Sequence, residues 1–320
     1  MKFSFLSPCV YLMVGFALAA SPKLWAQDPA AETLQQRVAL PTEGAAPKAP
    51  ETVGNKDLGD INAVQTFPKP AMFTFSTAQQ VFYTDNVFYT DANRVGSTAY
   101  LGSYTASFVP YSLRDWTPRI SLQYNMARYD RAAAGDFDNE NVAFSSQYVF
   151  SEDRAWSWTA TVNLSRFTAP HLNDSEFYKE VVYDNQITYV KQLLKDEPLF
   201  FVGAYDLAYH QANPAIYDRL DNTLSFSLAY YPIAEVSVGP FVRPGARTYF
   251  TDGTVALSTP VTQHDRNDFN LSEGLDVTWR PCEYVSLSAD IIHTDDYSSS
   301  AGLSYNDTIP GFDVAGTISF

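Results

Sequence analysis

The sequence lacks long hydrophobic runs and is poor in positive charge. Beyond the first 26 residues no segment approaches about 18 continuous apolar residues, which excludes transmembrane helices. The chain has 21 Lys and Arg against 36 Asp and Glu, a formal net charge of −15. Because an acidic chain cannot neutralise phosphates, nucleic acid is excluded as a partner. Only two cysteines occur, too few for a fold held together by disulfides.

The N-terminal segment predicts export. Lys2 supplies a positive charge, a short apolar run covers 10–20, and small residues follow. This run is too short to span a membrane and is typical of a secretory signal peptide. Cleavage fits after Ala20 or after Ala26, and we favour Ala26. We therefore expect residues 1–26 to be a signal peptide.

A segment rich in Ala, Pro, Gln and Glu follows at 27–69. It has few large apolar residues with which to offset the entropy of ordering. We expect a flexible periplasmic segment here, and one folded domain over 70–320.

That domain alternates apolar and polar residues with period two. Within 199–209, for example, Leu199, Phe201, Tyr205 and Tyr209 share one face. Such alternation over about ten residues predicts β-strands. The expected strands are 71–83, 98–111, 119–129, 141–150, 156–166, 181–192, 199–210, 220–231, 236–249, 268–279, 285–294 and 311–320.

The connections between these segments alternate short and long, as in membrane barrels. A soluble sandwich would also alternate, so the residues at the strand ends discriminate. Aromatic residues gather at the predicted ends, where a barrel meets lipid headgroups. They are Phe108, Phe150, Trp156, Tyr189, Tyr230 and Trp279 at the short turns, and Tyr83, Tyr209 and Phe269 opposite. The pattern predicts an all-β, closed antiparallel transmembrane barrel of about 12 strands.

The C-terminal strand carries a family resemblance. It reads GFDVAGTISF, with Phe312, Val314, Ile318 and Phe320 on one face. This end resembles the insertion signal of Gram-negative outer-membrane β-barrel proteins. The opening segment at 72–90, with its TDNVF, is similar to porin-type barrels. The resemblance implies an outer-membrane location, contact with outer-membrane lipids and lipopolysaccharide, and recognition by the barrel-assembly machinery.

Some residues conflict with this pattern. Glu273 falls on the apolar face, so we expect either a bulge at Gly274 that turns it inward or a later strand start. Asn185 is a milder conflict of the same kind. Pro240 and Pro244 predict an interrupted, bulged strand, because proline lacks a ladder donor.

Catalytic and metal motifs are not legible, so we predict no catalytic residues, no metal site and no cofactor. The histidines are His171, His210, His264 and His293. Outer-membrane phospholipases place His and Ser two residues apart on one strand, but Asp295 occupies that position after His293. We interpret the histidines as surface or loop residues. Acidic loops at 136–140, 251–253 and 293–296 lack the spacing of a calcium loop.

Residues opposite the apolar faces should line a lumen. We expect Asp206, Arg243, Arg247 and Asp290 near a constriction, because charged rings set channel selectivity. His210, Asp276 and Asp313 share that side.

We therefore expect a porin-like channel for passive diffusion of small hydrophilic solutes. A non-conducting structural or secretion-associated barrel, with 27–69 docking a partner, is the alternative. A lipid-modifying barrel enzyme is a weaker one.

Overall fold

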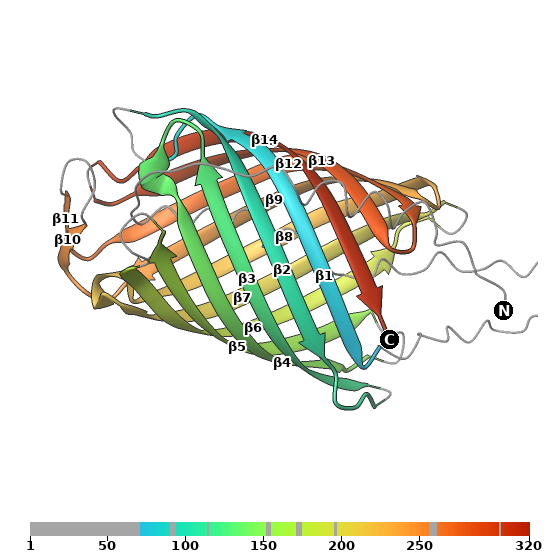
Figure 1. Ribbon diagram of the computed structural model, residues 1–320. Helices are drawn as coiled ribbons and strands as arrows, with labels where there is room; N and C mark the ends of the chain where they lie inside the picture. Colours follow the sequence, from blue (N-terminus) through green and yellow to red (C-terminus); the bar gives the residue numbers. More distant parts are fainter. Residues whose placement is uncertain are drawn as a thin grey trace, which may run out of the picture.

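The computed structural model describes residues 71–89, 94–113, 115–151, 155–170, 175–194, 197–255, 261–300 and 302–320. Within these ranges, twelve long strands close into one antiparallel barrel (Figure 1). The fold class predicted from the sequence is confirmed. The expected signal peptide and periplasmic segment lie outside the described residues, as does His171.

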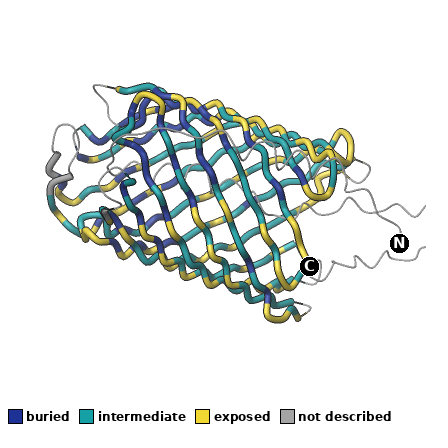
Figure 2. The backbone as a smooth tube through the Cα atoms, viewed as in Figure 1, coloured by how far each residue is buried: buried dark blue, intermediate teal, exposed yellow. Residues whose placement is uncertain are grey.

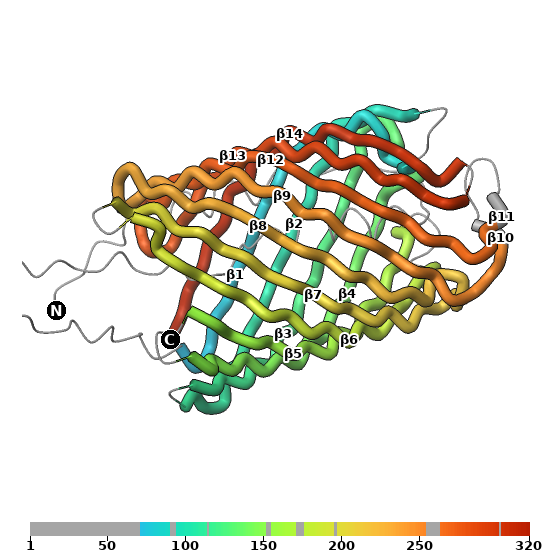
Figure 3. The backbone as a smooth tube through the Cα atoms, turned by 180° about the vertical axis from the view of Figure 1, so that it is seen from behind, coloured from blue at the N-terminus to red at the C-terminus, as the bar shows by residue number. Residues whose placement is uncertain are grey.

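Each strand pairs with its neighbours along the chain, and β1 closes on β14. The strands are β1 (Phe73–Thr84), β2 (Ser97–Phe108), β3 (Trp116–Tyr129), β4 (Phe137–Val149), β5 (Trp156–Ala169), β6 (Ser175–Gln192), β7 (Leu199–Asn213), β8 (Arg219–Ile233), β9 (Val236–Tyr249), β12 (Asn267–Cys282), β13 (Val285–Ser298) and β14 (Tyr305–Ser319). Strand β9 pairs with β12 because β10 (Gly253–Val255) and β11 (Val261–Gln263) form a separate hairpin in the loop between them (Figures 1 and 3). Two 3₁₀ turns, Ala133–Gly135 and Ala215–Tyr217, lie in other loops.

The barrel has a turn end and a loop end. The start of β1 and the C-terminus lie at the turn end, where the connections are short, and the β10–β11 hairpin lies at the loop end (Figures 1 and 3). Several strands extend further toward the loop end than the sequence predicts. Strand β6 begins at Ser175 rather than 181, and β14 at Tyr305 rather than 311. These extensions show no outward apolar alternation, because they lie beyond the lipid, whereas their inward residues Tyr178 and Ile309 belong to a buried apolar cluster.

The outer face of the wall is apolar and exposed. On β12, Phe269 and Trp279 are 48% and 49% exposed. In a water-soluble sandwich these side chains would be hidden. Around the turn end the aromatic side chains contact one another, with the Trp156 ring stacked on Phe150 and tilted against Tyr189. The wall therefore presents a lipid-facing band with an aromatic border.

The C-terminal strand takes part in this band. Phe312, Ile318 and Phe320 are exposed on the outer face. Phe73 and Phe320 exchange two backbone hydrogen bonds, with N···O distances of 2.9 and 3.0 Å. The residues of the expected insertion signal thus lie at the seam where β14 closes on β1.

Glu273 faces lipid, and both sequence expectations for it are wrong. The register of β12 against β9 and β13 is continuous through Gly274, so no bulge turns the side chain inward. Strand β12 also starts early, at Asn267. Glu273 is exposed between Leu271 and Leu275. Asn185 is likewise exposed on the outer face of β6.

The prolines of β9 interrupt its pairing with β8 but not its pairing with β12. Pro240 pairs with Leu275 and Pro244 with Leu271 on the β12 side. On the β8 side neither proline has a registered partner, and the shift there lies further along, between Tyr230 and Ile233. The missing N–H groups of the prolines therefore cost backbone pairing only on the β8 side. The predicted bulge at these prolines is wrong.

Candidate functional site in the barrel lumen

The inner face of the wall carries the residues that alternate with the lipid-facing ones. On β8, Leu224, Phe226 and Leu228 face out, while Thr223 and Ser225 face in. The same in-and-out alternation brings hydroxyl and amide side chains into the lumen on β2 to β5. There the Gln123 amide donates hydrogen bonds to Ser103 and Asn125. The lining is therefore hydrophilic along much of the described wall.

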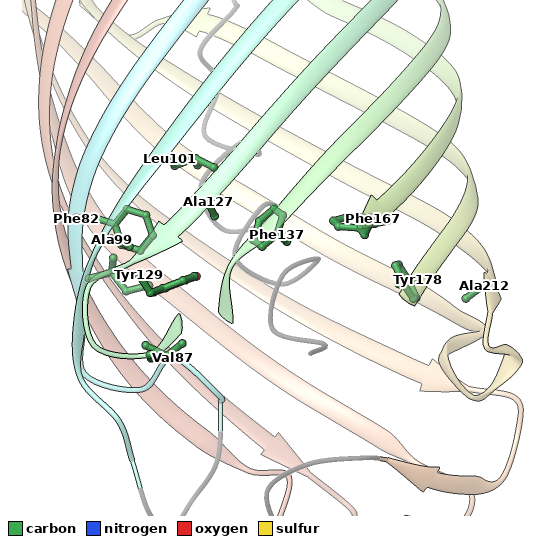
Figure 4. Close-up of a cluster of buried hydrophobic side chains, with 12 residues drawn as sticks. Phe82, Val87, Ala99, Leu101, Ala127, Tyr129, Phe137, Phe167, Tyr178 and Ala212 are labelled. Atoms are coloured by element: carbon green, nitrogen blue, oxygen red, sulfur yellow. The ribbon is translucent and has the colours of Figure 1, made fainter. Parts of the chain in front are cut away.

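Buried positions concentrate in the half of the barrel nearer the loop end (Figure 2). On the β1–β6 side they form an apolar cluster that projects inward (Figure 4). Its larger members are Phe82, Leu101, Tyr129, Phe137, Phe167, Tyr178 and Ile309. Phe137 packs on Phe167 at 5.9 Å between ring centroids. This cluster fills part of the lumen from one side.

The other side of the loop end holds a buried network of charges. The His210 Nδ1 lies 2.8 Å from Glu180, and its Nε2 lies 3.2 Å from Asp221. The Arg219 Nε donates to Asp221 at 3.0 Å. The side chains of His210, Glu180 and Arg219 are 3%, 8% and 7% exposed. Charges so deeply buried are tolerated because each has a partner.

Two further arginine pairs extend this network around the wall. Arg247 lies 3.5 Å from Asp296, and Arg266 lies 2.5 Å from Asp268. The Arg266 guanidinium also lies over the Tyr249 ring, 4.2 Å from its centroid. These arginines are therefore neutralised by neighbouring acids on the barrel wall.

Of the expected constriction residues, Arg247 belongs to this buried network. Asp206 lies on β7 opposite Gln186, which donates to it at 3.4 Å. Asp290 lies on β13 directly opposite Asp276 of β12. Both expected arginines lie on β9, whereas the two aspartates lie on β7 and β13. The four expected constriction residues therefore lie on three different strands of the wall.

Arg243 differs from the other arginines on this side. Its guanidinium carbon lies 4.6 Å from the centroid of Phe241, on the same strand. The part of the chain that the structure describes offers it no ion pair or hydrogen bond, whereas Arg219, Arg247 and Arg266 each contact a carboxylate.

The sequence reasoning missed Arg219, Asp221 and Glu180. Two of them open β8, in phase with the lumen-facing Thr223. The predicted strand began at 220, so Arg219 was assigned to a loop and its partner was not sought. Asp221 lies within the expected strand, and continuing the alternation from it by two positions reaches Arg219.

The interpretation of every histidine as a surface or loop residue is wrong for His210, which is 2% exposed. His264 is a loop residue, and its Nδ1 lies 2.9 Å from Asp252. His293 faces outward, with Nδ1 2.8 Å from the Thr308 hydroxyl and Nε2 3.5 Å from Asp295.

That outward group resembles a nucleophile, a base and an acid, but the strands beside it are paired on both sides. Their amides serve the ladder and cannot stabilise an oxyanion. Across the described residues, no group of three or more His, Cys, Asp or Glu is placed to hold a metal ion. No described helix has the length and apolarity needed to cross a membrane.

Known structures share this architecture. The COG4313 outer membrane channel from Pseudomonas putida F1 superposes with a TM-score of 0.52 at 16% identity, covering 82% of this chain and 100% of that one. The chain folds as an outer-membrane β-barrel. The KdgM porin covers 74% of this barrel's chain and 97% of its own at 7% identity, with a TM-score of 0.40. The beta domain of the Bordetella autotransporter BrkA covers 78% and 100% at 12% identity, with a TM-score of 0.44.

No family model and no curated protein sequence matches the barrel. At these identities the structural likeness defines its fold alone. A lipid-facing exterior and a closed wall place such a barrel in the outer membrane.

Proposed function

We propose that the barrel is a passive channel for small hydrophilic solutes. The observation that carries this proposal is the hydrophilic lining of the described wall, which contrasts with its apolar exterior. A barrel that served only as a scaffold could fill its interior with apolar side chains. Here Ser, Thr, Asn, Gln and charged residues alternate inward on most strands. Such a lining keeps water and polar solutes in a low-energy path across the bilayer.

The charge of the lining favours solutes of one charge sign over the other. Among the described lumen-facing strand residues, acids outnumber the arginines Arg119, Arg219, Arg243 and Arg247. These acids are Glu180, Asp184, Asp206, Asp221, Asp268, Asp276, Asp290, Asp296, Asp307 and Asp313. Negatively charged walls raise the local concentration of cations in a narrow pore. We therefore propose that cations permeate faster than anions of equal size.

Purified barrel reconstituted in a planar bilayer tests both statements. We expect stepwise conductance in KCl, and a reversal potential in a KCl gradient of the sign that K⁺ permeation produces. Absence of steps from folded protein would remove the channel proposal. Steps with a reversal potential of the opposite sign would keep the channel and remove the cation preference.

A non-conducting barrel is the second candidate, and the apolar cluster at the loop end favours it. Phe82, Tyr129, Phe137 and Phe167 project into the lumen from adjoining strands. If they close the path, replacing Phe137 and Phe167 with Ala should create conductance in a barrel that has none. If the wild type already conducts, the same change should widen the steps.

A further inference from the structure

Arg243 is an inward arginine of β9 that has no carboxylate partner among the described residues, whereas Arg247, on the same strand and face, contacts Asp296. The guanidinium carbon of Arg243 lies 4.6 Å from the centroid of the Phe241 ring, which covers one face of the group. The side chain is only partly buried, so its N–H edge faces the lumen. A guanidinium carries donors and no acceptor, so a solute that supplies oxygen acceptors can satisfy this edge.

The strands beside Arg243 place no acid next to it. On β12 it lies directly opposite Ser272. Across a sheet a side chain meets the residue opposite and the two diagonal to it. The other inward residues at these positions on β8 and β12 are uncharged, namely Thr223, Ser225, Ser227, Asn270 and Gly274. The immediate surroundings of the guanidinium are therefore hydroxyl groups, an amide and a glycine.

The wall holds the Ser272 hydroxyl in place. Its Oγ lies 2.9 Å from the hydroxyl of Thr294, which is directly opposite on β13 and is 1% exposed. When Thr294 donates this hydrogen bond, Ser272 keeps its own O–H for another acceptor. The Cβ atoms of opposite residues are about 5 Å apart. One small group can therefore accept hydrogen bonds from Ser272 and Arg243 together.

The wall also holds the Phe241 ring against Arg243. Phe241 lies directly opposite Gly274 of β12. A Cβ at Gly274 would meet the Ile291 carbonyl oxygen and would stand 2.8 Å from Phe241 Cζ. Glycine therefore lets the ring lie against β12, and the ring in turn supports the guanidinium. This accounts for the glycine that, on sequence grounds, suggested a bulge.

We propose that Arg243 and Ser272 form a carboxylate station, a lumen binding site for small monocarboxylates, an inference that rests on the proposed channel function. The two carboxylate oxygens accept hydrogen bonds from the planar edge of Arg243, and one of them also accepts from the Ser272 hydroxyl. Elsewhere the lining carries more acids than arginines. These acids repel an anion in proportion to its charge, so the station favours a monoanion over a dianion such as phosphate.

Acetate and acetamide are the probe pair, because they have the same shape and differ in charge. Saturation-transfer NMR on the full barrel in dodecyl maltoside micelles detects binding of either probe without requiring conductance. We expect magnetisation transfer from the protein to the methyl protons of acetate, and none to those of acetamide at equal concentration. Phosphate should displace acetate only weakly.

Variants assign the binding to the station. Arg243→Gln should raise the apparent dissociation constant of acetate about tenfold or more, because charge-assisted hydrogen bonds are lost. Ser272→Ala should raise it by a smaller factor. Arg243→Lys should lie between wild type and Arg243→Gln, because it keeps the charge and loses the planar fork. Arg119→Gln, which removes an inward arginine of β3, is the matched control and should leave acetate binding unchanged.

Conductance then places the station on the solute path. In a planar bilayer at constant K⁺ concentration, replacing chloride with acetate should lower the current of the wild type by a larger fraction than that of Arg243→Gln. An equal fall in both barrels would show that acetate does not bind on the path that ions take.

Equal saturation transfer to acetate and acetamide overturns the station, as does equal acetate binding by wild type and Arg243→Gln. If phosphate displaces acetate at lower concentration than acetate itself binds, the preference for monocarboxylates is wrong. These results leave the channel intact. A barrel that binds acetate through Arg243 and conducts no ions removes the channel and keeps the binding site, so the two failures are distinguishable.

Discussion

Glu273 is a carboxylate on the lipid-facing side of β12, and replacing it with Leu should stabilise the barrel. The outward residues of this strand run from Phe269 through Leu271, Glu273 and Leu275 to Trp279. No described residue forms an ion pair or a hydrogen bond with the Glu273 side chain. The position therefore places an unpaired acid among Leu271, Leu275 and Val242, with the outward His293 directly opposite it on β13.

The size of the expected stabilisation follows from the depth of residue 273 in the bilayer. With a tilt of about 40° and a rise of about 3.4 Å per residue, Glu273 lies about 10 Å below the level of Phe269 and about 15 Å above that of Trp279. Basic residues at the bilayer midplane cost about 2–4 kcal/mol and acids less, so we assign about 1–2 kcal/mol to Glu273. Leu adds about 0.5 kcal/mol of favourable transfer. The expected gain is about 2 kcal/mol.

Reversible urea unfolding of the barrel from lipid vesicles measures this gain in stability. At a slope of about 2 kcal/mol per molar urea, the midpoint should rise by about 1 M for Glu273→Leu. Glu273→Gln should give a smaller rise. Asn185→Leu, an uncharged lipid-facing control on β6, should also rise by less than Glu273→Leu. A midpoint that is unchanged or lower for Glu273→Leu would show that this side chain does not contact hydrocarbon.

Three other results are expected. Asp221→Asn leaves the buried Arg219 without its carboxylate, so it should cost about 3 kcal/mol or more in the same unfolding experiment; a loss below about 1 kcal/mol would contradict burial of the pair. The hydrogen bond with Asp252 raises the pKa of His264 above 6.5, and the bond with His264 lowers the pKa of Asp252 below 3.8. The pair should therefore protect its loop most between about pH 4 and 6.5, with protection lost as pH rises through the raised His264 pKa and as it falls through the lowered Asp252 pKa; proteolysis of this loop that does not vary with pH would refute the pairing. Phe320→Ala keeps the backbone bonds of the seam, so it should slow insertion by the assembly machinery while changing the unfolding midpoint little; an unchanged insertion rate would remove the proposed signal.

The architecture was predictable because lipid imposes a simple rule on a strand. Most lipid-facing positions are apolar, so Leu224, Phe226 and Leu228 reveal their strand without any knowledge of its neighbours. Closure then follows because an open edge has no partners in the bilayer. Beyond the lipid this constraint ends, and there the predicted boundaries failed, as at Ser175 and Tyr305.

The lumen was predictable only in part. The alternation along each strand assigned Asp206 and Arg243 to the inside. Which charged side chains contact each other depends on the register between strands, and a strand's own sequence does not encode that register. Arg247 and Asp296 lie 49 positions apart and contact each other only because β9, β12 and β13 align as they do. For the same reason, the absence of a carboxylate partner for Arg243 among the described residues could not be deduced from its neighbours in the sequence.

The seam between β1 and β14 constrains how the molecule can form. Thr74 and Ser319, which are 245 positions apart, face each other across it. A chain still emerging from its synthesis cannot make this pairing, so earlier strands must wait with unsatisfied edges. Contacts of such long range are slow to form and expose aggregation-prone intermediates. We therefore expect a nascent barrel of this design to need protection from aggregation until its final strand arrives.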